Sequence, residues 1–163
     1  MKTQNITYLY ILIFVALLVS GCTDKSRPTD LPKLYTCKIK VTQDGKPLEE
    51  ATVTLLSKTP SKYGASSATT NATGVAVLRT YGYDGVPLGE YSVTITKTGV
   101  EGAKEAETPE GIHYHVGGKV YSYVDSKFSD DTKPPYEIKV TESGVNETFD
   151  AGAPVHMFLR NNE

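Results

Sequence analysis

Short β-prone runs separated by turn residues are the feature that most constrains this chain. Runs rich in Val, Ile, Thr and Tyr are separated by Gly, Pro, Asp and Asn, and no sustained helical period appears. Several short strands at near-regular spacing predict an all-β fold, a single antiparallel β-sandwich of about seven to nine strands. Strands are expected over residues 34–42, 51–57, 66–70, 75–80, 90–96, 112–116, 119–124, 136–141 and 147–151, with an edge strand over 154–160.

Turn chemistry supports this reading. The stretches "QDGKP" and "NATG" each supply a glycine, Gly45 and Gly74, that can adopt a positive φ. Residues 98–111, "TGVEGAKEAETPEG", are charged and irregular. We expect them to form a solvated loop.

The N-terminus predicts export and lipid anchoring. Lys2 precedes an apolar run over residues 8–19, which is too short to span a bilayer as a helix. The run ends at "VSGC", residues 19–22, which resembles the lipobox of bacterial lipoproteins. That resemblance implies cleavage before Cys22 and acylation of its thiol and amine. More than one acyl chain gives stable membrane anchoring.

These features divide the chain into three parts. Residues 1–21 are expected to be a signal peptide and residues 22–33 a flexible, proline-bearing tether. Residues 34–163 would form one domain, large enough to bury a core without disulfides. We expect a bacterial cell-envelope protein, anchored in the outer membrane rather than the inner one where a cell has two.

Cysteine usage and charge exclude several classes. With Cys22 lipidated, Cys37 has no partner for a disulfide, and its place in the alternating run "LYTCKIKV" predicts a small buried side chain. The formal net charge of −2 shows no basic excess. Nucleic acid is therefore not an expected partner.

The order of motifs resembles the carboxypeptidase regulatory-like domain, a transthyretin-like, immunoglobulin-like β-sandwich. The stretch "VTQDGKPLEEATVTLLS" is followed by "SSATTNATGVAVLRTYGYDGVPLGEYSVTITK". Among members of this family, the chain looks most like the small lipoproteins of planctomycetes and related bacteria. The resemblance covers most of residues 38–150 and implies a fold without catalytic residues or cofactors. Residues 99–119 are longer and richer in Tyr and His than the family leads us to expect.

Within "PLGEYSVTI", Tyr91, Val93 and Ile95 alternate and should share one buried face. Gly89 would allow a tight approach at the start of the strand. Tyr91 is placed to direct its hydroxyl at a backbone group near the strand start, as in a tyrosine corner.

The stretch "GIHYHVGGKVYSYV", residues 111–124, predicts a hairpin that turns at Gly117-Gly118. Val116 would then pair with Lys119. One face would carry Ile112, Tyr114, Val116, Tyr121 and Tyr123, and the other would carry His113, His115, Val120, Ser122 and Val124. His113 and His115 would lie about 6.6 Å apart along the strand, close enough for one metal ion. The face lacks a third ligand, and His156 is the remaining histidine, so no metal is expected.

Three functions remain open at this point. The first is a non-catalytic, lipid-anchored envelope module that binds an envelope protein or polysaccharide. The second is a carbohydrate-binding module that uses Tyr114, Tyr121 and Tyr123, with Tyr81 and Tyr83, although the chain has no Trp. The third is a metal-dependent enzyme using His113 and His115, because "GIHYHV" resembles the His-x-His strand of intradiol ring-cleaving dioxygenases. The acidic stretch "DSKFSDD" lacks the spacing of a calcium loop and is expected to be solvated.

Overall fold

The computed structural model describes residues 27–161, except for the side chains of Tyr114 and His115. The chain divides into two compact units, residues 1–31 and residues 32–163. In the first unit, the described residues form a turn in which the Leu31 amide donates to the Pro28 carbonyl at 3.1 Å. The predicted signal peptide and residues 22–26 of the predicted tether, Cys22 included, lie outside the described residues. None of the helices formed by residues 27–161 is long and apolar enough to cross a bilayer.

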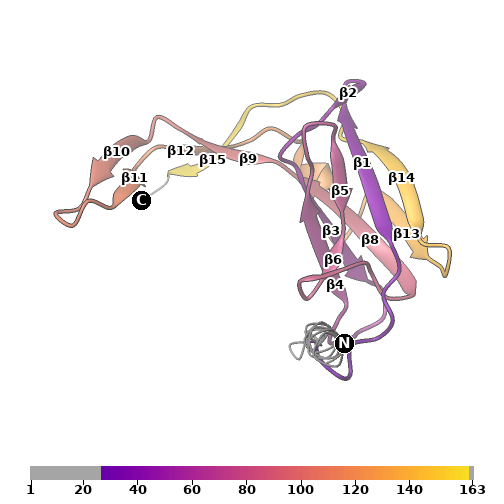
Figure 1. Ribbon diagram of the computed structural model, residues 1–163. Coiled ribbons are helices and arrows are strands. Elements are labelled where there is room, and N and C mark those ends of the chain that lie inside the picture. The colour runs from indigo at the N-terminus through magenta and orange to yellow at the C-terminus, as the bar shows by residue number, and fades with distance from the viewer. Residues whose placement is uncertain (1–26, 162–163) are drawn as a thin grey trace, which may run out of the picture. The chain divides into compact units, whose positions relative to one another are not determined.

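The second unit contains a β-sandwich, and the predicted all-β fold class is confirmed (Figure 1). One sheet has the order β13-β8-β3-β4-β6-β7, and the other has the order β14-β1-β2 with β5 also paired to β1. The bounds are β1 Cys37–Gln43, β2 Lys46–Pro47, β3 Thr52–Ser57, β4 Ala65–Thr69, β5 Val75–Val77, β6 Arg79–Thr80, β7 Tyr83–Asp84, β8 Gly89–Thr96, β13 Tyr136–Val140 and β14 Val145–Asp150. Each predicted strand in this region is present with ends shifted by a few residues, except that the strand predicted over residues 75–80 is divided into β5 and β6, which belong to different sheets.

Strict alternation builds the core between these sheets. Along β1, Cys37, Ile39 and Val41 are fully buried, while Lys38 and Lys40 face solvent. The facing sheet contributes side chains from β3, β8 and β13. Burial raises the pKa of the Cys37 thiol to about 12. This residue is therefore the inert, buried side chain that its sequence context predicts.

One pairing departs from the purely antiparallel sandwich that the sequence led us to expect. Strands β1 and β14 run parallel, with Cys37 opposite Val145 and Thr42 opposite Asp150. A parallel pair needs a long connection between its strands. Here the connection is nearly the whole domain, so the first and last strands of the sandwich close it side by side.

The two predicted turns form as expected. Asp44 and Gly45 both have positive φ, and Gln43 pairs with Lys46 across them, which is the two-residue hairpin geometry. At the second turn, the Gly74 amide donates to the Asn71 carbonyl at 2.8 Å. A Cβ at Gly74 would lie 2.5 Å from the Val41 carbonyl oxygen, so this position requires glycine on steric grounds as well.

The tyrosine corner is confirmed. Tyr91 is 2% exposed, and its hydroxyl donates to the Pro87 carbonyl at 3.0 Å. Its ring lies against Gly89, where a Cβ would be 3.3 Å from the ring. Val93 and Ile95 are buried on the same face of β8. The segment 87–95 is therefore a structural element of the core.

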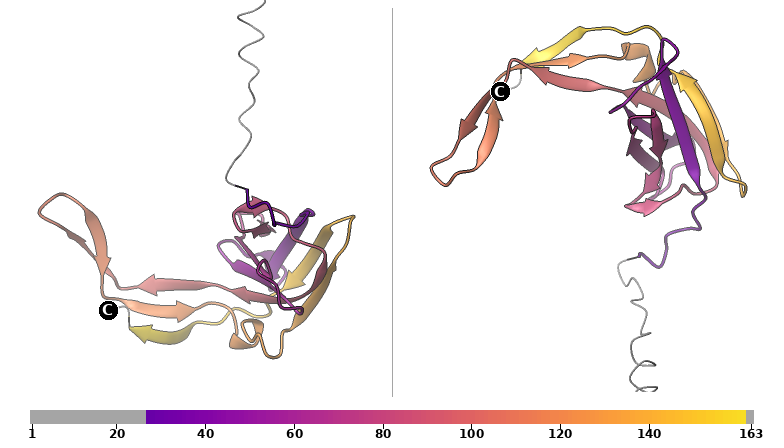
Figure 2. Two further views of the ribbon diagram at one scale, coloured as in Figure 1. Left: turned by 90° about the horizontal axis from the view of Figure 1, so that it is seen from below. Right: turned by 45° about the horizontal axis from the view of Figure 1, so that its top comes forward.

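The largest correction concerns residues 98–124. Instead of a loop followed by a hairpin, this region forms β9 (Thr98–Glu101), β10 (Lys104–Glu107), β11 (His113–Val116) and β12 (Lys119–Ser122). Strand β12 lies between β9 and β15 (Met157–Asn161), and β10 pairs with β11 (Figures 1 and 2). We call β9 to β12 together with β15 the β-arm. The predicted edge strand near the C-terminus is β15.

Gly117-Gly118 is therefore not a hairpin turn, and the predicted pairing of Val116 with Lys119 is wrong. The chain turns at Thr108–Gly111, where the Gly111 amide donates to the Thr108 carbonyl and the Thr108 amide donates to the Ile112 carbonyl, both at 2.9 Å. Gly111 has a φ of 82°. This is a three-residue loop with Pro109 after the first turn residue, and its glycine takes the left-handed position. Three of the charged residues that suggested a loop, Lys104, Glu105 and Glu107, lie in β10.

We expect Tyr91→Ala to lower the free energy of unfolding by about 3 kcal/mol or more, because it removes a buried aromatic ring. Tyr91→Phe keeps the ring and loses the bond to Pro87, which should cost about 1 kcal/mol. Chemical denaturation measures both. Tyr136→Phe is the matched control, since the Tyr136 hydroxyl donates to the Asp150 carbonyl at an exposed site. An equal loss of unfolding free energy in Tyr91→Phe and Tyr136→Phe would show that the bond to Pro87 contributes no more than an exposed hydrogen bond does.

Candidate functional site

The β-arm has two sections, β9-β12-β15 and β10-β11, with a break in strand pairing between them. Lys119 lies opposite Glu101 on one side of the break, and Val116 lies opposite Lys104 on the other. Both strands thus skip two residues, and the register is the same on the two sides. Cross-strand partners share a face of a sheet, so the register assigns the side chains to two faces in each section of the arm, the one inside the break and the one beyond it.

Glycines make the break. Gly102, Gly117 and Gly118 all have positive φ, with values of 70°, 68° and 95°. At Gly118, a Cβ would lie 2.9 Å from the Ala103 nitrogen and from the Glu101 oxygen. At Gly102, a Cβ would meet nothing within 4 Å. The Gly-Gly pair that suggested a hairpin therefore allows a close backbone crossing within the ribbon.

One face of the arm, here called the polar face, carries an aromatic and acidic cluster. Glu101 Oε1 accepts a hydrogen bond from the Tyr123 hydroxyl at 2.7 Å and lies 2.9 Å from His156 Nε2. The His156 ring stacks on Tyr121, with centroids 4.1 Å apart and planes 13° from parallel. Phe158 meets Tyr121 edge-on at 5.9 Å. These contacts join all three strands of the sheet.

Hydrogen bonding shifts two pKa values in this cluster. The bond from Tyr123 and then the one from His156 lower the pKa of the Glu101 carboxyl. The same bond raises the pKa of the Tyr123 hydroxyl. Each shift favours the state in which a carboxylate accepts and a phenol donates. The cluster is thus suited to holding the strands together across neutral pH.

The tyrosines that suggested sugar binding do not form one open platform. Tyr121 and Tyr123 are half-buried, and their rings contact His156. Tyr81 is 67% exposed, but it lies beside Tyr63 between β6 and β7, in a different sheet. The side chain of Tyr114 lies outside the described part of the chain. The described rings therefore give the carbohydrate hypothesis no specific support.

The predicted metal candidates are placed separately from His156. His113 Nδ1 lies 3.4 Å from Glu105 Oε1 across the distal hairpin, whereas His156 belongs to the polar-face cluster. The side chain of His115 lies outside what the structure describes. Among the described residues, no three His, Cys, Asp or Glu side chains gather as metal ligands would.

The acidic stretch 125–131 has a structural use. Asp125 accepts a hydrogen bond from the Lys127 amide and caps the short helix η1, Ser126–Phe128. Asp130 accepts from the Thr132 amide and hydroxyl, which lowers the pKa of its carboxyl. Phe128 is buried in the core. These carboxylates cap turns in an exposed loop.

The opposite face of the arm, here called the apolar face, is rich in exposed aliphatic side chains. Register places Val100 opposite Val120, Lys104 opposite Val116, and Met157 opposite Ser122. Of the nine large hydrophobic side chains exposed among the described residues, six belong to the arm. Five of these lie on or beside the apolar face, namely Val100, Ile112, Val116, Met157 and Leu159, and they are 38% to 63% exposed. Such concentrations mark interaction surfaces more often than scattered residues do.

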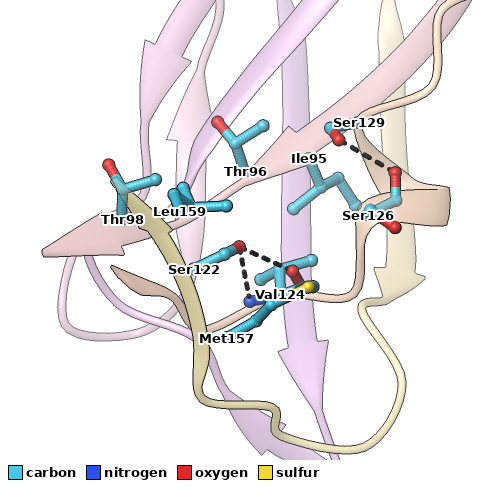
Figure 3. Close-up of a pocket in the computed structure, with 9 residues that line it drawn as sticks. All are labelled: Ile95, Thr96, Thr98, Ser122, Val124, Ser126, Ser129, Met157 and Leu159. Atoms are coloured by element: carbon cyan, nitrogen blue, oxygen red, sulfur yellow. Dashed lines mark hydrogen bonds between the residues drawn. The ribbon is translucent and has the colours of Figure 1, made fainter. Parts of the chain in front are cut away.

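A small crevice lies where this face meets the sandwich (Figure 3). It has a volume of about 150 Å³, and its apolar wall consists of Ile95, Val124, Met157 and Leu159. Hydroxyls surround this wall, but those of Ser122 and Ser129 donate to the Val124 and Ser126 carbonyls. The crevice therefore offers an apolar wall with the hydroxyls of Thr96, Thr98 and Ser126 beside it, and none of its lining side chains is an acid or a base.

Sequence reasoning missed Glu101, His156 and Phe158. His156 and Phe158 were placed in the predicted edge strand, but without a partner strand their face was undefined. Glu101 was assigned to a loop. A sequence signal did exist, since Thr98–Glu107 can pair with His113–Ser122 across the "TPEGI" turn with glutamates on one face.

Comparisons with known proteins identify a solved structure with a low similarity to this chain. No protein-family model matches the chain. No curated protein matches its sequence. One solved structure, a variant of BcpA, the major pilin subunit of Bacillus cereus, is similar at 14% identity with a TM-score of 0.40. The match covers 82% of this chain and 31% of that one, so the chain spans less than a third of the pilin subunit.

We expect Tyr123→Phe to raise the pKa of Glu101 toward its ordinary value, because Tyr123 supplies the strongest of the bonds that lower it. Since the folded-state pKa is depressed, the stabilisation is present above the unfolded pKa and is lost as pH falls through the folded one. Carbon-detected NMR titration of the Glu101 carboxyl measures its pKa, and chemical denaturation at a series of pH values measures the change in stability. Tyr121→Phe is the control, because the Tyr121 contacts described here are ring contacts. An unchanged titration in Tyr123→Phe would contradict the assignment.

We expect Gly118→Ala to loosen the arm more than Gly102→Ala. Both substitutions force a non-glycine residue to positive φ, but only the first brings a Cβ within 2.9 Å of backbone atoms. Amide hydrogen exchange should accelerate in β9 and β12 of the Gly118 variant, while β3 and β8 remain protected. Equal acceleration in both variants would show that φ strain alone sets the effect.

Proposed function

We propose that this protein is a lipid-anchored, non-catalytic β-sandwich module of the bacterial cell envelope, and that the β-arm is its interaction element. The observation that carries this proposal is the exposed apolar face of the arm. Catalysis needs titratable groups gathered in a cleft, whereas exposed aliphatic side chains on a ribbon suit contact with another surface.

Anchoring is proposed from the sequence. The "VSGC" stretch at residues 19–22 follows an apolar run that is too short to span a bilayer, and a polar tether follows it. Acylation of Cys22 would place the domain at a membrane surface, which we propose to be the outer membrane in a cell that has two. An envelope protein or polysaccharide then becomes an accessible partner.

We also propose kinship with the carboxypeptidase regulatory-like domains. Three features support it: the Asp44-Gly45 hairpin, the Asn71–Gly74 turn, and the tyrosine corner that follows Pro87. The β-arm is the departure from that family. On this proposal, the sandwich is a general scaffold and the arm carries what is particular to this protein.

We expect Cys22→Ala to abolish acylation and to move the protein from the membrane fraction to the soluble one. Fractionation and mass spectrometry of the mature N-terminus measure this. Cys37→Ala is the matched control, because its thiol is buried in the core and should not affect anchoring. An unmodified Cys22 in the wild type, or cleavage at another residue, would overturn the lipoprotein proposal.

A further inference from the structure

We propose that the apolar face of the β-arm docks onto the lipid bilayer in which the protein is anchored. This inference rests on the proposed lipid anchor and adds a second membrane contact, made by the folded domain itself. Its occupant is the headgroup and upper acyl region of a bilayer that contains anionic lipid.

The first observation is the separation of charges between the two faces. Inside the break, Glu101 lies on the face away from Val100 and Val120, and beyond it Glu105 and Glu107 lie on the face away from Val116. In each section the carboxylates are therefore on the side away from the aliphatic residues, which is the side called the polar face. On the apolar face, the charged residues are Lys104, opposite Val116, and Arg160, opposite Val120. Aliphatic side chains flanked by cations match a membrane surface, where long basic side chains reach lipid phosphates while their stems stay apolar.

The same separation argues against a second copy as the occupant. Packing two apolar faces against each other would bring Lys104 and Arg160 of both copies into a contact in which the paired strand residues of these faces include no carboxylate. The flat footprint is also small. From Thr98 to Thr108 the ribbon is about 33 Å long, and it is two or three strands wide, which gives roughly 400 Å². Stable dimers bury about 800 Å² of accessible surface per partner.

Chain length permits the contact. The predicted tether of residues 22–33 can extend to at most about 40 Å, which is longer than the arm. The domain could therefore lie against the bilayer without strain on the anchor. Anchoring also keeps the arm at a high local concentration near lipid, so a weak contact is sufficient.

The aliphatic side chain of Ile112, at the end of the arm, would reach lipid first. Ile112, beside the turn, is 63% exposed and is the most exposed aliphatic residue of the described arm. Glu110 lies in the same turn and is also exposed. This carboxylate should limit the depth of insertion, so Glu110→Lys is expected to deepen it.

The test uses the absence of tryptophan from the chain. The mature lipidated protein, which begins at Cys22, is reconstituted in vesicles of phosphatidylethanolamine and phosphatidylglycerol with brominated acyl chains, which quench tryptophan that reaches them. Ile112→Trp and Val100→Trp report the apolar face. Glu107→Trp reports the polar face near the same end of the arm, and Leu88→Trp reports the sandwich at an exposure of 50%, close to the 48% of Val100.

We expect blue-shifted, quenched emission from the Ile112→Trp and Val100→Trp proteins and unquenched emission from the two control proteins. Adding Lys104→Glu to Ile112→Trp should reduce the quenching, because it places a carboxylate on the docking face. Lys119→Glu, which changes a cation opposite Glu101 on the polar face, should leave it unchanged. Circular dichroism of each variant confirms that the fold is retained.

The remaining outcomes separate this inference from the anchor. Protein that sediments with the vesicles but shows no quenching at Ile112→Trp or Val100→Trp overturns the docking and leaves the anchor intact. Equal quenching at all four positions overturns it in favour of general adsorption. A blue shift without quenching that grows with protein density overturns it in favour of a second copy. Protein that stays in the supernatant overturns both proposals.

Discussion

Strand β8 is the element on which the rest of the domain depends. It pairs with β3 on one edge and β13 on the other, so it is internal to the six-stranded sheet. Its inward face places Tyr91, Val93 and Ile95 in the core, and Tyr91 also holds the preceding Pro87 segment. Strand β8 ends at Thr96, and after the single residue Lys97 the chain continues as β9 of the arm. A single run of residues thus serves both the core and the arm.

Hydrogen bonds to backbone carbonyls help to hold the junction between the sandwich and the arm. The Tyr123 amide donates to the Lys97 carbonyl at 2.9 Å, and the Gln43 side chain donates to the Tyr123 carbonyl at 2.9 Å. Farther out, the arm has no second layer to cover its apolar face. Two-stranded ribbons are marginal alone, so cross-strand side-chain pairs must supply the stability. The Glu101, Tyr123 and His156 contacts supply it near the base, where β15 adds a third strand.

Sequence reasoning succeeded where periodicity alone was sufficient. The inward positions of β1 and β8 alternate so regularly that only one face can be buried, which also identifies Cys37 as a core residue. It failed between residues 98 and 124 because two registers compete there. Gly117-Gly118 satisfies the rule for a two-residue turn, and Thr108–Gly111 satisfies the rule for a longer one. Local turn chemistry cannot rank them, since the ranking depends on where β15 pairs, and β15 is distant in sequence.

The wrong turn predicted at Gly117-Gly118 also gave a wrong chemical expectation. A turn at Gly117-Gly118 puts Tyr121 and Tyr123 on the face of Ile112 and Val116, which suggests an aromatic platform. In the observed register, Tyr121 lies opposite Gly99 and Phe158, while Val120 lies with Val100. Moving the turn by a few residues therefore reassigns every side chain of one strand to the other face. The result is an arm in which strand carboxylates lie away from the aliphatic residues, and in which Lys104 and Arg160 lie on the aliphatic side. No single segment of the sequence contains that segregation, because it arises only when strands from three separate stretches are paired.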